Sequence, residues 1–200
     1  MTDRTQLWRM APTELAPHED ALSRFAAELE RAGGTSVRVS AAELAGAITA
    51  ALAAAGAHRV ALTADLGDAR PVIAAALEAA RYEVVDYEAV AGTPAAVGRL
   101  DATVTGCVAA VAATGSIVTG GAAGRGGALV APTHICVVET RRVVDGLTSL
   151  LRLAPRVGAG SMLAIQTGPS RTADIEKTLV IGVHGPKRVD VVLLDGVLTD

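Results

Sequence analysis

The sequence predicts an α/β fold in which a mostly parallel, Rossmann-like sheet carries helices on both faces. Short runs rich in β-branched residues alternate with helical runs, as in successive βαβ units. Connections between such strands are expected to be right-handed crossovers. Half of the 200 residues are hydrophobic but only 2% are aromatic, so Ala, Val, Leu and Ile must build the core. A chain of this length can bury one sizeable core, and we expect a single domain over residues 1–200.

Boundary signals place the elements of the first half. Ser40 and Glu43 match a capping box at the start of one helix, and Gly56 is suited to end it. Pro71 suits the first turn of the next helix. The elements expected in order are a helix over 18–32, a strand over 36–39, a helix to about residue 55, a strand over 59–63, a helix over 71–80 and a strand over 83–86.

The alternation continues less regularly in the second half. Gly146 weakens one of its helices, and residues 155–160 are interpreted as a loop within the domain. The elements expected in order are a strand over 102–105, a short helix over 107–113, strands over 116–119 and 134–138, a helix over 143–153, a strand over 162–166, a helix over 174–181 and a strand over 189–194.

A glycine-rich segment, 120–127, separates two of these strands. It lacks the Gly-Lys-Ser/Thr ending of a P-loop, and a strand is expected after it. A dinucleotide fingerprint would instead open a helix at the glycines. The plain interpretation is therefore a loop between strands. A second interpretation is that this loop closes over a ligand, with Arg125 supplying the charge.

The stretch after residue 166 predicts an anion site. An apolar, strand-like run leads into a loop that holds Gly168, Ser170, Arg171 and Thr172, and a helix is expected to follow. The free N–H groups and the dipole of a helix N-terminus favour negative charge. Arg171 adds a two-point contact for a carboxylate or a phosphate. The alternative role for Arg171 is a structural ion pair with an acidic residue of that helix.

Four further residues are candidates for the same ligand site. Gly115 and Ser116, in a turn before a strand, would form its opposite wall, or they form a turn with local hydrogen bonds. His134 and His184 are candidates for ligand-facing groups, although a lone histidine more often has a structural role. Ser170 lacks the G-x-S-x-G context of a nucleophile, so no catalytic residue is assigned.

Composition excludes several classes of function. A net charge of −3 and few aromatic residues provide neither a basic surface nor a stacking platform for nucleic acid. The longest apolar stretch, 44–57, is shorter than the roughly 20 residues of a membrane-spanning helix. Cys107 and Cys136 are expected to be reduced core thiols of a cytoplasmic protein without a signal peptide. No His/Cys cluster has zinc spacing, so we expect neither a metal site nor a resident cofactor.

Several motifs resemble those of a known family. The segments Gly168–Glu176 and Leu179–Pro186 resemble the C-terminal signature of the lactate-utilisation protein C family, also called the LUD domain. Thr114-Gly115-Ser116 and Pro132–Val138 match the middle motifs of that family in the right order. The matching stretch runs from about residue 101 to residue 194.

The resemblance implies a fold similar to ribose-5-phosphate isomerase, glucosamine-6-phosphate deaminase and CoA transferases. It also implies a role in oxidising L-lactate to pyruvate alongside iron–sulfur partner subunits. Two cysteines cannot ligate a cluster unaided, so this chain would be a non-cluster or accessory subunit that binds a small anion.

Ala113 departs from the family pattern, because many relatives carry a glutamate there. That glutamate would lie near the nucleophilic carboxylate of CoA transferases, and alanine cannot form an acyl-enzyme. The departure weighs against an independent transferase. Two alternatives stay open: an autonomous enzyme that acts on a sugar phosphate, a folate-like molecule or a CoA ester, and a scaffold with a vestigial pocket.

Overall fold

The computed structural model describes residues 19–153, 163–173, 179–181 and 185–196. Six parallel strands form the main sheet, and this confirms the predicted fold class. The inner strands are mostly apolar and are buried on both faces, as is typical of parallel strands covered by other elements. In spatial order the strands are β1 (Thr35–Val39), β12 (Arg188–Leu194), β7 (Thr133–Glu139), β4 (Ala102–Thr105), β2 (Arg59–Leu62) and β3 (Glu83–Asp86).

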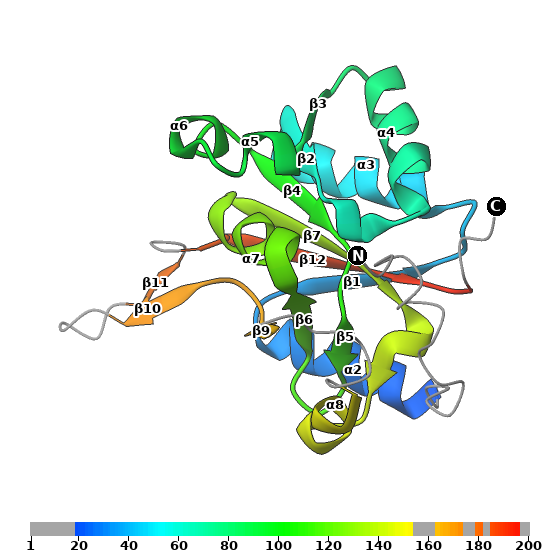
Figure 1. The fold of residues 1–200 in the computed structure, drawn as a ribbon. Coiled ribbons are helices and arrows are strands. Elements are labelled where there is room, and N and C mark those ends of the chain that lie inside the picture. Colours follow the sequence, from blue (N-terminus) through cyan, green and yellow to red (C-terminus); the bar gives the residue numbers. More distant parts are fainter. Residues whose placement is uncertain (1–18, 154–162, 174–178, 182–184, 197–200) are drawn as a thin grey trace, which may run out of the picture.

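Helices cover both faces of this sheet (Figure 1). On one face lie α3 (Leu44–Ala55) and α4 (Ala69–Ala79), whose leucines and isoleucines pack in one core cluster with β2, β4, β7 and β12. On the other face, α2 (Glu19–Arg31) packs through Phe25 and Leu29, which are fully buried. The helices predicted around these ranges are confirmed, and Gly56 ends α3 in the left-handed conformation.

A second, four-stranded sheet shares the face covered by α2. Its strands in spatial order are β8 (Val143–Val144), β5 (Ala109–Val111), β6 (Ser116–Gly120) and β9 (Leu163–Gln166). The short helix predicted over 107–113 is wrong, because β5 pairs with a neighbour on each side and its small residues are buried on both faces. The helix predicted over 143–153 begins later, as α8 (Leu147–Leu153), because its first two residues pair with β5.

The glycine-rich segment is a helix, so its prediction as a loop is wrong. Helix α7 (Gly121–Val130) follows β6 directly and packs against β4 and β6. The Thr103 hydroxyl donates a hydrogen bond to the Gly127 carbonyl, and Ala128 is buried. These tertiary contacts override the low helix propensity of glycine. Two further short helices, α5 (Tyr87–Val90) and α6 (Pro94–Val97), and two 3-10 turns, η2 (Ala64–Leu66) and η3 (Thr140–Arg142), were not anticipated from the sequence.

The helix predicted over 174–181 is wrong where the structure describes it. β10 (Arg171–Ala173) and β11 (Leu179–Ile181) form an antiparallel pair, with Arg171 opposite Ile181. Residues 174–178 lie outside the described residues. The branched residues of 179–181 favour a strand, and Figure 1 shows the hairpin extending away from the two sheets. Arg171 therefore begins a strand rather than preceding a helix.

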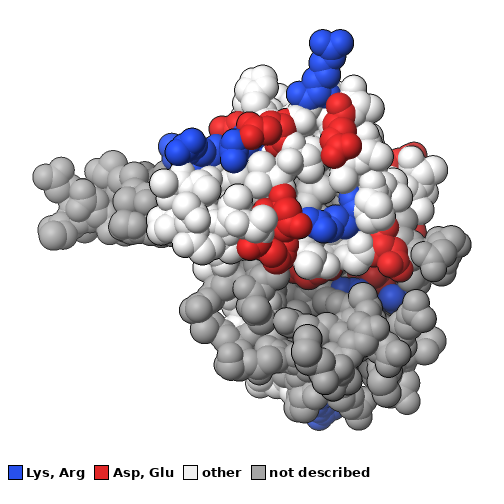
Figure 2. Space-filling model, turned by 45° about the horizontal axis from the view of Figure 1, so that its top comes forward, with Lys and Arg blue, Asp and Glu red and all other residues white. Residues whose placement is uncertain are grey.

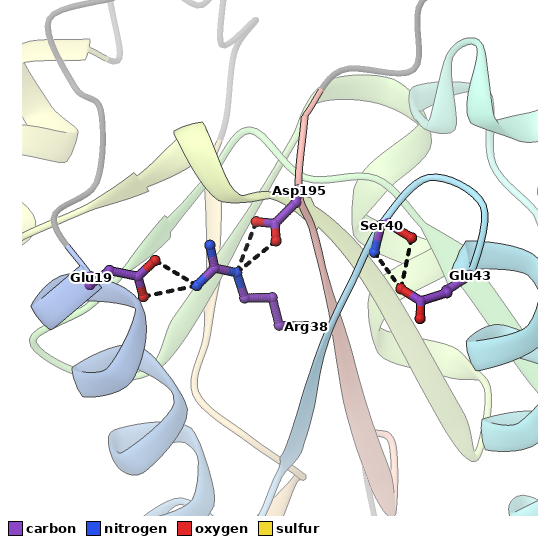
Figure 3. A network of polar contacts seen from close by, with 5 residues as sticks. All are labelled: Glu19, Arg38, Ser40, Glu43 and Asp195. Atoms are coloured by element: carbon purple, nitrogen blue, oxygen red, sulfur yellow. Dashed lines mark hydrogen bonds and ion pairs between the residues drawn. The ribbon is translucent and has the colours of Figure 1, made fainter.

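Polar contacts join the first elements of the chain (Figure 3). The Arg38 guanidinium donates 2.8 Å hydrogen bonds to Glu19 and to Asp195, and so connects α2, β1 and the end of β12. All three side chains are exposed, so the network stabilises the fold only modestly. The predicted capping box is half formed: Glu43 accepts from the Ser40 N–H at 2.9 Å, but the Ser40 hydroxyl donates to the same carboxylate at 2.7 Å.

Candidate functional site

The chain reverses its direction of travel across the main sheet between two neighbouring strands, β2 and β4. After β2 the chain continues to β3 at one edge, whereas after β4 it continues through β7 to β12 toward the other. In open α/β sheets, ligands bind outside the carboxyl ends of strands at such a switch point. The segments that follow β2 and β4 are therefore the first place to look for a site.

These two segments are held tightly together. The Asp65 carboxylate accepts a hydrogen bond from the Gly106 N–H at 3.0 Å and another from the Thr63 hydroxyl. A Cβ at Gly106 would lie 2.2 Å from the Asp65 carbonyl oxygen, so only glycine permits this approach. The Ala64 N–H donates to the Glu88 carboxylate at 2.9 Å. The switch point thus carries two carboxylates whose positions are set by backbone N–H groups.

His134 lies beside the switch point in a buried polar layer between the two sheets. Its Nδ1 is 3.1 Å from the Gln166 Oε1, and its Nε2 is 2.9 Å from the Thr105 hydroxyl. An amide oxygen only accepts, so in this arrangement Nδ1 carries the proton and Nε2 accepts from Thr105. Complete burial lowers the pKa of His134 to about 4, against a smaller raising effect of the Gln166 hydrogen bond. The imidazole is therefore neutral at pH 7.

Gln166 is the last residue of β9, and Ser116 lies on the side of this strand end opposite to His134. Its buried hydroxyl is 2.7 Å from the Thr114 hydroxyl and 2.7 Å from the Thr167 hydroxyl. Because side chains alternate along a strand, Gln166 meets His134 on one side and Thr167 meets Ser116 on the other. The structure thus brings two sequence-predicted residues to the two sides of one short segment, but not into contact with each other.

Gly115 and Gly168 are both packed against α2. Gly115 has a φ of +61°, and a Cβ there would lie 2.1 Å from the Leu29 backbone nitrogen. Gly168 has a φ of +65°, and its Cβ would lie 2.5 Å from the Ala32 carbonyl oxygen. Glycine at these two positions is explained by the close approach of a helix backbone.

The remaining predicted residues follow Gly168. The Ser170 N–H donates to the Pro186 carbonyl at 2.9 Å, and the Ser170 side chain is next to Gly185. Arg171 and Thr172 belong to β10, so neither lies at a helix N-terminus. His184 lies outside the described residues.

Sequence reasoning missed the hydroxyls and carboxylates of the switch point. Thr63 and Asp65 follow a correctly predicted strand, so the rule for carboxyl ends could have identified them. Thr103 and Thr105 occupy alternate positions of an otherwise apolar strand and face the same side as His134, to which Thr105 is bonded. Gln166 had no such signal, because its contact with His134 depends on where β9 pairs.

Both cysteines are buried and free, as expected of core thiols. The neighbouring Cys107 thiol and burial together raise the pKa of Cys136 well above its ordinary value. The guanidinium of Arg142 donates to the Cys107 carbonyl at 2.7 Å and to Glu139 at 2.8 Å, and burial lowers the pKa of Arg142. The Cys136 thiol therefore stays protonated at neutral pH.

Charge on the described surface is mixed. Figure 2 shows basic and acidic side chains close to one another on the face it presents. Within the described ranges, no group of three or more His, Cys, Asp or Glu residues could hold a metal ion. The helices described here include none that is both long and apolar enough to cross a bilayer.

Comparison with known proteins identifies a family model and a relative that each cover most of the chain. Residues 22–194 match the family model described as LUD domain. Lactate utilization protein C of Deinococcus radiodurans is 33% identical over 183 residues, which span 88% of this chain and 80% of that protein. Lactate utilization protein C of Bacillus subtilis is 37% identical over 76 residues, which span 36% of this chain and 32% of that protein.

A solved structure confirms the fold. The crystal structure of a DUF162 family protein from Deinococcus radiodurans has a TM-score of 0.65 and 29% sequence identity. The match covers 90% of this chain and 100% of that one.

Proposed function

The chain belongs to the LUD domain family, and we propose that it acts in lactate utilization as a non-cluster subunit that binds a small anionic ligand. The observation that carries this proposal is the similarity to lactate utilization protein C of Deinococcus radiodurans, which spans 88% of the chain. The matching family model spans residues 22–194, which include every strand of the main sheet. The proposed role is thus that of the whole domain rather than of one motif.

The ligand is proposed to lie near the segment 168–172, with Arg171 as its main positive charge. Because Arg171 begins β10 in the described part of the chain, the proposed positive charge is that of the guanidinium rather than that of a helix dipole. Ser170 and Thr172 provide hydroxyls, and Ser116 belongs to the opposite wall, whereas Gly115 is packed against α2. His134 is neutral at pH 7, so it orients polar groups rather than adding charge. His184 remains a candidate for a ligand contact.

Electrons from lactate oxidation are proposed to pass to iron–sulfur partner subunits. The chain has two cysteines, both buried, whereas a protein-bound cluster is usually held by four. Purified alone, the protein should therefore contain no stoichiometric iron. An affinity-tagged copy isolated from lactate-grown cells should carry iron-containing proteins with it, and its isolation without them would remove the partner proposal.

Growth on lactate tests the proposed role directly. Deletion of the gene in its own host should abolish growth on L-lactate but not on pyruvate. The wild type should restore growth, and Arg171→Lys should not, because lysine cannot make a planar two-point contact. Arg24→Lys, a change of the same kind on the exposed side of α2, is the matched control and should restore growth. Normal growth of the deletion strain on L-lactate would reject the proposal.

A further inference from the structure

We propose that Cys107 and Cys136 form a modification site, at which a peroxide oxidises the two thiols to a disulfide within one chain. The pair lies where the main sheet leads into the second sheet, and none of the residues assigned to the lactate-related ligand takes part. The proposal therefore stands independently of the proposed function.

The fold places the two cysteines on one side of the main sheet. Thr105, at the end of β4, is the register partner of Cys136 in β7, so these two side chains share a face. Cys107 follows two residues later, on the connection from β4 to β5, and packs in the same core cluster as Cys136. Strand pairing thus brings together two cysteines that are far apart in the sequence.

Two hydrogen bonds of Cys136 show how close the thiols lie. Its Sγ is 3.7 Å from the carbonyl oxygen of Gly106, the residue directly before Cys107. A second hydrogen bond joins the two thiol groups themselves, and this bond and burial together raise the pKa of Cys136. Sulfurs in such contact need only a small rotation of their side chains to reach the length of a disulfide bond, roughly 2 Å.

The backbone that carries Cys107 is held in place from two sides. The Gly106 N–H donates to the Asp65 carboxylate at 3.0 Å, and the Arg142 guanidinium donates to the Cys107 carbonyl at 2.7 Å. Two groups that are already positioned react with each other much faster than with groups on another molecule. The geometry therefore favours a disulfide within the chain over one between two chains.

Charge gives the two cysteines different roles. The Arg142 side chain is only 11% exposed, and Cys107 raises the pKa of this guanidinium against the larger, lowering effect of burial. A neighbouring cation stabilises a thiolate, which is the reactive form of cysteine. Cys136 instead has a raised pKa and remains a thiol. Cys107 is therefore the thiol that reacts with the oxidant, and Cys136 is the one that completes the disulfide.

The two thiols supply the two electrons that reduce hydrogen peroxide. The Cys107 sulfur attacks one peroxide oxygen, the O–O bond breaks, and a sulfenic acid and one water are formed. The Cys136 sulfur then attacks the Cys107 sulfur, and the S–O bond breaks. The departing hydroxide takes the Cys136 thiol proton and leaves as the second water. Because both sulfurs are buried, these steps should be slower than at an exposed thiol.

Peptide mapping by mass spectrometry tests the proposal on the folded wild type after incubation with hydrogen peroxide. Free thiols are alkylated in denaturant before digestion. The peptides that contain Cys107 and Cys136 should be joined, with neither thiol alkylated, and dithiothreitol should restore both thiols. Circular dichroism should show that the oxidised protein is still folded. Two free thiols in a sample whose methionines are oxidised, or a disulfide between two chains, would reject the pair.

Single variants test the assigned order of the two steps. In Cys136→Ala the sulfenic acid at Cys107 has no thiol to react with, so dimedone should label Cys107 after peroxide treatment. In Cys107→Ala, the matched control, Cys136 should remain a free thiol. Labelling of Cys136 in Cys107→Ala, with Cys107 unlabelled in Cys136→Ala, would overturn the assigned roles. The wild-type measurement decides the disulfide itself without requiring that either variant folds.

Discussion

Replacing Gly115 with alanine is expected to lower the free energy of unfolding by about 4 kcal/mol. Two costs combine in this variant. The φ of +61° is unfavourable for any residue with a Cβ, and the new Cβ would lie 2.1 Å from the Leu29 nitrogen and 2.6 Å from the Glu28 carbonyl carbon. These atoms belong to the backbone of α2, so no side-chain rotation can relieve the contact. The turn and the helix must move apart instead.

Urea denaturation followed by circular dichroism measures the effect. Gly46→Ala is the matched control: it lies within α3, a Cβ there meets nothing within 4 Å, and alanine should stabilise the helix by roughly 1 kcal/mol. Gly168→Ala should behave like Gly115→Ala, because it has a positive φ and would meet the Ala32 carbonyl oxygen at 2.5 Å. An unchanged urea midpoint for Gly115→Ala would show that α2 does not pack against this turn.

Gly115 also shows where sequence reasoning reaches its limit. The motif Thr114-Gly115-Ser116 indicates a turn that requires glycine, and the structure contains that turn. A sequence cannot tell whether a ligand or another part of the chain approaches the backbone there. Here the approaching group is α2, which comes much earlier in the chain. Long-range packing of this kind leaves no local pattern.

Strands of the main sheet could be predicted because their runs of β-branched and apolar residues favour a strand over a helix. The ranges 83–86 and 102–105 agree with β3 and β4 at both ends. Buried parallel strands read as continuous apolar runs, and the intervening helices carry an apolar stripe. The pattern therefore identified the main sheet and the helices on both of its faces.

The failures share one cause, which is tertiary contact that overrides local propensity. Alanine-rich β5 resembles a helix in sequence, but it forms a strand because its neighbours β6 and β8 pair with it. The glycine-rich segment resembles a loop, but it forms α7 because Gly126 and Gly127 allow close packing on the main sheet. Small residues carry little local signal, and their state is decided by what packs around them.

The candidate site could be predicted only in part for the same reason. His134 opens a predicted apolar strand and was a candidate on that ground, and the structure places it in β7, next to β4. Its partners Thr105 and Gln166 come from strands of two different sheets, and their meeting depends on how the sheets pack. The sequence also implied that a helix dipole would attract an anion near Arg171, whereas Arg171 begins strand β10 in the structure.

Acidification is expected to destabilise the protein by up to about 3 kcal/mol through His134 alone. The pKa of this histidine is about 4 in the folded protein, against an ordinary value of 6.5, because burial disfavours the charged imidazolium. Between these pH values the unfolded chain binds a proton at His134 and the folded protein does not. Stability from this group is therefore complete above pH 6.5 and is lost as the pH falls toward 4.

The hydrogen bonds explain why the folded protein resists this proton. Nδ1 already donates to Gln166, so protonation would occur at Nε2, which accepts from the Thr105 hydroxyl. That hydroxyl would have to turn and accept instead, while a charge forms in a fully buried site. Urea denaturation at several values between pH 7 and pH 4.5 should thus show a steeper decline for the wild type than for His134→Gln. His58→Gln, a change at an exposed histidine, should keep the steeper decline of the wild type. Parallel pH profiles for the wild type and His134→Gln would mean that the folded protein accepts a proton at His134 without losing stability. The assignment of His134 as a neutral imidazole with its proton on Nδ1 would then be wrong.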